Sequence, residues 1–227
     1  MKIYGLQKLT LLDYPGNTAC TVFTSKCNFR CPYCHNAELA WMDPDELMTE
    51  GRFLEFLKTR RGLLDGIVIS GGEPTLQNDL VPFMAHVRNM GFKVKLDTNG
   101  TSPSVLREIF KRGAADYIAM DIKNSISKYD ITARPKGIKN VTKVIAESIN
   151  LIMCNGIDYE FRTTVVKEFH ELGDFREIDS MIKGASKYFL QPYKTPPNHN
   201  PRFTEPDREF LEKIQSSMSV PTYIRGI

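Results

Sequence analysis

Short apolar runs alternate along the chain with longer stretches in which apolar residues recur at helical spacing. Each short run is rich in β-branched residues and bounded by Gly, Asn, Asp or Pro, as buried parallel strands tend to be. This alternation predicts an α/β protein built from six βα units, wound as a barrel or an open sheet. The six predicted strands cover residues 18–23, 66–70, 92–97, 116–121, 159–166 and 187–191.

Start signals and apolar spacing predict helices between these strands. Asp43-Pro44-Asp45-Glu46 offers an N-cap, a proline at the first helical position and a glutamate at the third, ahead of apolar residues at 53–57. Ser102-Pro103 repeats the start signal before the next apolar stretch. Apolar residues three or four positions apart predict two further helices, over residues 141–152 and 210–218.

The composition is that of a globular protein. Of 227 residues, 41% are hydrophobic and 25% charged, and 30 Lys and Arg against 27 Asp and Glu give a net charge of +3. This excludes a disordered or collagen-like chain, and so balanced a charge argues against nucleic acid or a membrane as a partner. We expect one domain over residues 1–227, with a short N-terminal extension of about residues 1–16. With no apolar run near a membrane span and no signal-peptide core, we expect a cytoplasmic protein.

The cysteines point to the functional site. Cys27, Cys31 and Cys34 fall together in the long connection between the first predicted strand and the next helix, whereas Cys20 and Cys154 stand alone and are expected to pack in the core. Long loops in compact domains are usually functional, and chemistry in α/β folds gathers at the carboxyl ends of the strands. The sequence therefore places a site at this connection.

Several kinds of site fit part of this cysteine pattern. A redox pair of Cys31 and Cys34 leaves Cys27 unexplained, and attachment of c-type haem at Cys31, Cys34 and His35 would imply export. A zinc ion held by the three thiolates and His35 would strain the chelate at the adjacent Cys34 and His35. Unliganded core cysteines would not be surrounded by Asn28, Arg30 and Pro32. Closely spaced thiolates suit an iron–sulfur cluster, and three ligands leave one iron of a four-iron cluster open.

The spacing Cys-x3-Cys-x2-Cys, with Tyr33 before the third cysteine, resembles the signature of the radical S-adenosylmethionine (SAM) enzymes. The resemblance implies that Cys27, Cys31 and Cys34 ligate a 4Fe–4S cluster whose fourth iron is chelated by the amine and carboxylate of SAM. It also implies a partial (β/α)6 TIM-like barrel of the radical SAM type, in agreement with the six units. Tyr33 would belong to the cofactor-binding residues.

A glycine-rich turn follows the second predicted strand. Gly71, Gly72, Glu73 and Pro74 resemble the GGEP segment of this family, which meets the amino group of the methionyl moiety. Taken alone, two glycines after a strand would indicate an ordinary turn to a helix. Beside the cysteine motif, these four residues are interpreted as cofactor-binding.

Charged residues close the next strands at the same rim of the predicted sheet. Asp97 and Thr98 end the third strand, Asp121 and Lys123 end the fourth, and Arg162 lies on the fifth. In the members of this family that activate glycyl radical enzymes, a matching Asp-x-Lys segment lies beside the carboxylate of the cofactor. The resemblance thus implies that Lys123 binds this carboxylate, and Arg162 is a second basic candidate, for which pairing with a carboxylate of the protein is the alternative. It also suggests a monovalent cation near Asp97 and Asp121.

Residues 5–8, 12–16, 34–36 and 159–164 resemble the glycyl radical enzyme activases, in particular the activating proteins of anaerobic ribonucleoside-triphosphate reductase. The resemblance implies an oxidoreductase that reductively cleaves SAM and forms a glycyl radical on a partner enzyme. No side chain would be catalytic beyond the cluster and SAM. An electron donor such as flavodoxin or ferredoxin is implied as a second partner.

The chain departs from this family at two positions. Lys26 stands where a glycine is expected before the first cysteine, and Lys194 stands where the pyruvate formate-lyase activating enzyme has a histidine that touches the ribose. His199 is a candidate substitute, whereas His170 is expected at the surface. Three alternatives remain open: an activase of pyruvate formate-lyase or another glycyl radical enzyme, a small-molecule enzyme such as 7-carboxy-7-deazaguanine synthase, and a non-catalytic iron–sulfur or zinc module.

Overall fold

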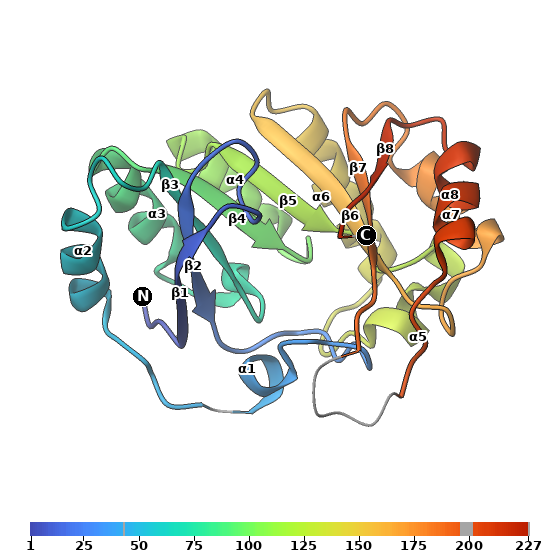
Figure 1. Cartoon of the computed structure of the whole chain (residues 1–227), viewed down its shortest axis with the longest axis horizontal. Coiled ribbons are helices and arrows are strands. Elements are labelled where there is room, and N and C mark those ends of the chain that lie inside the picture. Colours follow the sequence, from blue (N-terminus) through green and yellow to red (C-terminus); the bar gives the residue numbers. More distant parts are fainter. Residues whose placement is uncertain (43, 196–201, 227) are drawn as a thin grey trace.

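A single curved sheet of eight strands, in sequential order, forms the centre of the molecule (Figure 1). The structure is a computed structural model that describes residues 1–42, 44–195 and 202–226. β1 (Gly5–Thr10) runs antiparallel to β2 (Ala19–Thr24), and every later strand is parallel to the one before it. The later strands are β3 (Gly66–Gly71), β4 (Lys93–Thr98), β5 (Tyr117–Asp121), β6 (Asp158–Val165), β7 (Tyr188–Pro192) and β8 (Thr222–Ile224).

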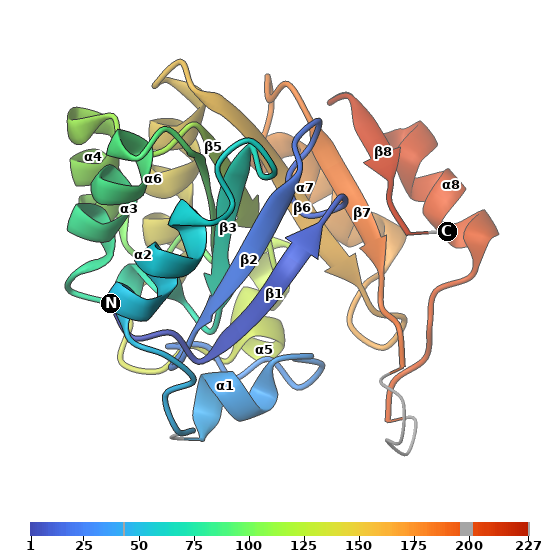
Figure 2. The same cartoon turned by 60° about the vertical axis from the view of Figure 1, so that its left-hand side comes forward.

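The longer helices cover the convex outer face of the sheet, and the two short ones lie below the sheet in the view of Figure 1 (Figures 1 and 2). The apolar sides of the longer helices pack on the strands, as the amphipathic spacing predicts. The longer helices are α2 (Glu50–Lys58), α3 (Leu80–Asn89), α4 (Pro103–Arg112), α6 (Val141–Met153), α7 (Leu172–Met181) and α8 (Arg208–Ser217). The shorter ones are α1 (Ala37–Trp41) and α5 (Tyr129–Ala133), with single 3-10 turns η1 (Pro74–Leu76) and η2 (Ile126–Lys128).

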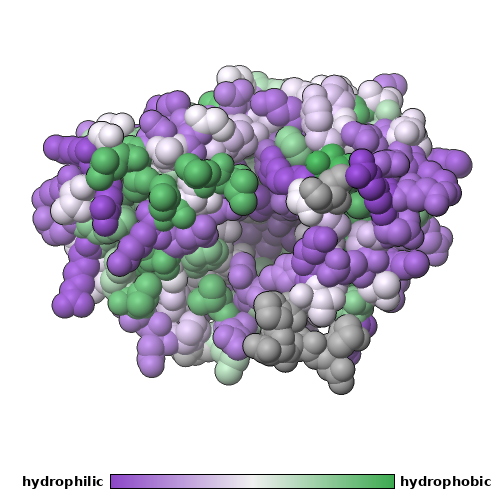
Figure 3. All heavy atoms as spheres, viewed as in Figure 1, coloured by the Kyte–Doolittle hydropathy of each residue, from purple (hydrophilic) through white to green (hydrophobic). Residues whose placement is uncertain are grey.

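The barrel is partial, as predicted, and the six predicted strands are β2 to β7. Two edge strands were not predicted. β1 lies within the supposed N-terminal extension and has three successive exposed residues, and β8 is only three residues long, so neither shows a strand-like apolar run. In the described part of the chain these edges do not pair with each other. Figure 3 shows the molecule hollowed between them.

The helix expected to begin at Asp43-Pro44 begins later. The Thr49 side chain caps α2 by accepting from the backbone N–H of Arg52 at 3.4 Å. Residues 44–46 are not helical, and Met48 pairs with Ile3 in an antiparallel bridge that holds the segment extended. Asp43 lies outside the described residues. Tertiary pairing therefore overrides the local start signal, whereas Pro103 does open α4 as predicted.

Alternation along the strands places charged residues inside the barrel. On β4, Val94 and Leu96 belong to the hydrophobic core, while Lys95 and Asp97 point to the opposite face. Because the parallel strands all end at one rim, polar residues that close them gather there. In the described residues, no helix is both long and apolar enough to cross a membrane.

Candidate cofactor site

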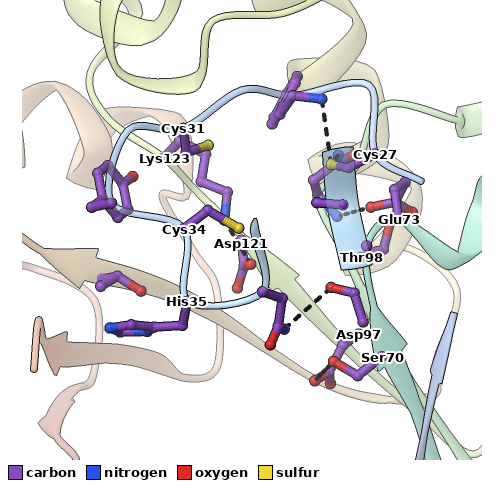
Figure 4. A pocket seen from close by; sticks show the side chains of 18 of the residues that line it. Cys27, Cys31, Cys34, His35, Ser70, Glu73, Asp97, Thr98, Asp121 and Lys123 are labelled. Carbon is purple, nitrogen blue, oxygen red and sulfur yellow. Dashed lines mark hydrogen bonds and ion pairs between the residues drawn. The ribbon is translucent and has the colours of Figure 1, made fainter. Parts of the chain in front are cut away.

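The loop that carries the three cysteines closes the carboxyl-terminal end of the barrel (Figure 4). Backbone hydrogen bonds hold it at both sides: Cys27 donates to the carbonyl of Ala40 at 3.0 Å, and Arg30 donates to that of Ala133 at 2.9 Å. One pocket lies beneath it. Of the residues predicted to bind the cluster or SAM, those that line this pocket are Cys27, Cys31, Tyr33, Cys34, Gly71, Gly72, Glu73, Asp97, Thr98, Asp121, Lys123 and Arg162.

Lys26, where the family pattern has glycine, adopts a left-handed backbone conformation with φ of 68°. This region is open to glycine, but it costs other residues roughly 1–2 kcal/mol. The backbone N–H of Lys26 bonds to the carbonyl of Leu39 at 2.9 Å, which fixes the turn into the cysteine loop. The departure seen in the sequence thus falls at a position where glycine has a physical reason to occur.

The three thiols are largely withdrawn from water. Burial raises the pKa of the Cys27 thiol to about 11 and that of Cys31 to about 12, and it also raises the pKa of Cys34. Around Cys27, the backbone N–H of Phe29 lies 3.3 Å from the sulfur. Thiolates at this site therefore need a positively charged partner such as iron.

The donor set of the loop consists of soft sulfur ligands. Soft sulfur ligands select zinc or iron–sulfur clusters. Among the described residues, however, no three His, Cys, Asp or Glu side chains lie close enough to share one metal ion. His35 is used elsewhere, because its ring stacks on Tyr193 with centroids 5.3 Å apart and its Nε2 lies 2.8 Å from the Lys194 carbonyl oxygen. This geometry does not support a zinc site completed by His35.

The glycine-rich turn packs directly against the start of the cysteine loop. The N–H of Gly72 donates to the carbonyl of Thr24 at 2.9 Å, and that of Glu73 donates to Lys26 at 2.7 Å. A Cβ on Gly72 would lie 2.1 Å from the Lys26 oxygen, and one on Gly71 would lie 2.3 Å from the Thr24 oxygen. The glycines therefore allow backbone to meet backbone, in addition to lining the pocket. Pro74 does not line the pocket but begins η1.

We expect Gly72→Ala to destabilise the protein by roughly 1–3 kcal/mol, because the new methyl group would push against the cysteine loop. Cluster incorporation should fall with it. The control is Gly173→Ala in α7, where a Cβ would meet nothing within 4 Å and helix propensity improves. Urea unfolding and iron content after anaerobic reconstitution measure both effects. Equal behaviour of the two variants would contradict this account of the turn.

Glu73 is buried, with 1% of its surface exposed, beside Cys27 and Thr98 (Figure 4). Its Oε1 accepts from Thr98 Oγ1 at 2.8 Å, and its Oε2 accepts from the backbone N–H of Asn99 at 2.7 Å. Burial raises the pKa of Glu73, and these hydrogen bonds limit the rise. The carboxylate is thus fixed by neutral donors, which leaves its charge available to a cationic ligand group.

On the other side of the pocket, two carboxylates and two cations form a network. Arg162 bridges them, with Nη2 3.1 Å from Asp97 Oδ2 and Nε bonded to Asp121 Oδ1. Lys123 Nζ donates to Asp121 Oδ2 at 2.8 Å, and Ser70 Oγ donates to Asp97 Oδ2 at 3.1 Å. The structure therefore brings together the residues that the sequence placed at one rim.

Burial alone would raise the pKa of Asp97 and Asp121, but Arg162 and the neighbouring lysines reverse the effect and lower both. Burial would likewise lower the pKa of Lys123, and Asp121 raises it instead. All four groups are accordingly charged near neutral pH. Such a network inside a low-dielectric cleft can recognise an ionic ligand strongly.

Two predictions about isolated residues were wrong. His170 is buried, with Nε2 3.0 Å from the Lys123 carbonyl and Nδ1 3.1 Å from the backbone nitrogen of Val166, so it supports the turn that presents Lys123. Burial lowers the pKa of His170. Cys154 is exposed at the end of α6 rather than in the core, whereas Cys20 is fully buried as expected.

Lys194, whose contact with the ribose was left in doubt by the sequence, remains outside this network. Lys194 pairs with Glu205 at 3.3 Å, and His199 lies outside the described residues.

Tyr33 is buried with its ring 5.6 Å from that of Phe169, and its hydroxyl has no partner among the described residues. A polar atom without a partner beside the thiols is consistent with a pocket meant to hold a group.

Comparison with known proteins agrees with this geometry. Residues 21–174 match the model of the Radical SAM superfamily. The chain is 35% identical over 197 residues to a Methanocaldococcus jannaschii protein provisionally named a glycyl-radical enzyme activating enzyme, covering 85% of this chain and 80% of the relative. It is 25% identical over 199 residues to the pyruvate formate-lyase-activating enzyme of Clostridium pasteurianum, covering 86% and 82%. A radical SAM methyltransferase from Sphaerobacter thermophilus has the same fold, with a TM-score of 0.72 and 17% identity over 96% of this chain and 68% of the other.

Proposed function

The chain belongs to the radical SAM superfamily, and we propose that it forms a glycyl radical on an anaerobic ribonucleoside-triphosphate reductase. It is a radical SAM enzyme whose homologues are named as activating enzymes of glycyl radical enzymes. The relative from M. jannaschii is the observation that carries the class of reaction. The identity of the partner rests on the resemblance of residues 5–8, 12–16, 34–36 and 159–164. Pyruvate formate-lyase is the alternative partner, favoured by the relative from C. pasteurianum.

The family implies a 4Fe–4S cluster and SAM, and the pocket offers groups for both. Cys27, Cys31 and Cys34 would ligate the cluster. Lys123 and Arg162 would bind the methionyl carboxylate, and Glu73 would face its amine. When bound, these cofactors supply a one-electron cleavage of SAM and a radical that takes a hydrogen atom from a glycine. The protein's own side chains bind, orient and shield them.

The open side of the barrel supports a protein as substrate. The hollow between β1 and β8 leads towards the interior of the sheet (Figure 3), where a segment of a partner could approach the pocket. Beside it, the end of β1 and the turn after it expose apolar residues: Leu9 is 57%, Leu11 68% and Leu12 83% exposed. Neighbouring exposed leucines of this kind mark surfaces that contact other macromolecules.

Several finer expectations stay proposals. A reduced flavodoxin or ferredoxin would donate the electron. One domain over residues 1–227 and a cytoplasmic location stay predictions from the sequence. A monovalent cation near Asp97 and Asp121 is the alternative to side-chain cations as the balance of these carboxylates, and withdrawing sodium and potassium during SAM binding would reveal it. In the structure both carboxylates are already paired with side chains.

Formation of 5′-deoxyadenosine tests the proposal. The reconstituted, reduced enzyme is incubated with SAM alone, with the cognate reductase, or with pyruvate formate-lyase from the same cell. We expect the reductase to become radical-bearing and active. Activation of pyruvate formate-lyase alone would show that this enzyme, and not the reductase, is the partner, and the proposed class of reaction would stand. Cleavage of SAM without activation of either protein, together with modification of a small molecule, would overturn the proposed class.

A further inference from the structure

Lys95 is a charged residue of the barrel interior that the cofactor assignment does not use. It lies on β4 with 1% of its surface exposed, among the largest fully buried side chains. Its Nζ donates to Asp97 Oδ1 at 2.5 Å, and it lies 5.9 Å from the centroid of the Tyr117 ring. Lys95 is not part of the pocket wall, so it lies behind Asp97 as seen from the pocket. Lysine is almost never buried to this extent unless it is paired.

The pairing of Lys95 changes the charge balance at the pocket. Arg162 is shared between Asp97 and Asp121, and Lys123 pairs with Asp121. Without Lys95, two carboxylates would face two cations and their charges would cancel. With Lys95 there are three cations, and one positive charge is left over.

Glu160 is another buried carboxylate whose pKa is lowered by Arg225 and also by Lys95 and Arg162, but it has a cation of its own. Glu160, on the neighbouring part of the interior, is bound by Arg225 through two hydrogen bonds, Nη1 to Oε1 at 2.8 Å and Nη2 to Oε2 at 2.9 Å. It also accepts from the Tyr117 hydroxyl at 2.9 Å. Glu73 lies across the pocket beside Cys27 and is held by neutral donors (Figure 4). The unbalanced positive charge is therefore located at Lys123 and Arg162, on the wall that carries Asp97 and Asp121.

We propose that Lys95 is a positioning residue for SAM: by neutralising Asp97 from behind, it leaves Arg162 and Lys123 free to attract the methionyl carboxylate. This inference rests on the proposed function, because it takes the pocket to be the SAM site. Lys95 does not touch the ligand. It acts through Asp97, in a low-dielectric interior where one unit of charge has a long reach. The chain itself thus supplies a fixed cation next to these carboxylates.

The test is the affinity of the reconstituted protein for SAM, measured by equilibrium dialysis without any partner protein. Lys95→Met keeps the length of the side chain and removes its charge. We expect it to weaken SAM binding roughly 10- to 30-fold, the scale of one unit of charge acting through a neighbouring residue in an effective dielectric of about 20. Iron content should be unchanged. Lys93→Met, an exposed lysine two residues earlier on the same strand, is the matched control and should bind as the wild type does.

Decarboxylated SAM separates charge from packing. It lacks the carboxylate and keeps the amine and sulfonium cations, so Lys95→Met should bind it at least as tightly as the wild type does. An equal loss for both ligands would mean that Lys95 only supports the fold, and would overturn the inference. If Lys95→Met does not fold, Lys95→Ala is measured with and without ammonium chloride. Recovery of SAM affinity by ammonium supports the inference, and absence of recovery overturns it.

Ion dependence of the wild type gives an independent outcome. Because Lys95 is a built-in cation, wild-type affinity for SAM should not change when potassium and sodium are replaced by a bulky organic cation at constant ionic strength. A loss of affinity in the wild type would show that a bound ion, not Lys95, balances Asp97. Failure of the wild type to bind SAM under any condition would instead count against the proposed function.

Discussion

Replacing Cys27, Cys31 or Cys34 by alanine is expected to reduce SAM cleavage below detection, because each change removes a cluster ligand. The three sulfurs line one pocket and lie in a loop that backbone hydrogen bonds hold in place, so no neighbouring cysteine is positioned to substitute. Ultraviolet–visible absorption and iron content after anaerobic reconstitution report the cluster, and 5′-deoxyadenosine reports the cleavage. Both should fall together.

The chain supplies its own controls for this experiment. Cys154→Ala alters an exposed residue and should change nothing. Cys20→Ala removes a buried sulfur that does not line the pocket and should cost stability without loss of iron. Normal iron content and normal cleavage in any one of the three loop variants would contradict the assignment of that cysteine. Loss of iron in Cys20→Ala without unfolding would contradict the choice of ligands.

Lys123→Ala is expected to weaken SAM binding about 10- to 150-fold, which corresponds to the roughly 1.5–3 kcal/mol of one charge-assisted contact. The cluster should still assemble, because Lys123 lies on the turn after β5 and not on the cysteine loop. Equilibrium dialysis of the reconstituted variant measures the affinity. The exposed Lys139 provides a control: Lys139→Ala should bind SAM normally.

Two results would contradict a contact between Lys123 and SAM. Unchanged affinity in Lys123→Ala would mean that its ammonium serves Asp121 alone. A variant that neither folds nor retains iron would place Lys123 among the residues that maintain the barrel, and a Lys123→Met substitution, which keeps most of the buried side chain, would then have to show the selective loss of affinity.

The parallel strands and the rim of the site could be predicted from the sequence because their signals are local. Apolar runs mark β2 to β7, and the residues that follow those runs must meet at one rim once the strands are parallel. Asp97, Asp121 and Lys123 were placed together by this reasoning, and the structure adds Arg162, which bridges the two carboxylates. The cysteine spacing likewise predicted which three thiols lie together at the cluster site, since all three belong to one loop.

The remaining features depend on contacts between distant segments. The edge strand β1 forms because β2 offers it a partner, not because its own residues alternate clearly. The start of α2 is set by the bridge between Ile3 and Met48. His170 and Lys95 have no sequence signal as buried residues, because their partners, the carbonyl of Lys123 and the carboxylate of Asp97, become known only when the barrel is folded.

The central claim, formation of a glycyl radical on a partner protein, is tested most directly by electron paramagnetic resonance. The reduced enzyme is mixed with SAM and the anaerobic ribonucleotide reductase, and the spectrum is recorded with the native partner and with a partner in which the radical-bearing glycine is alanine. We expect a doublet from the remaining Cα hydrogen in the first sample and none in the second. Production of 5′-deoxyadenosine with no doublet on this reductase or on pyruvate formate-lyase would contradict the central claim.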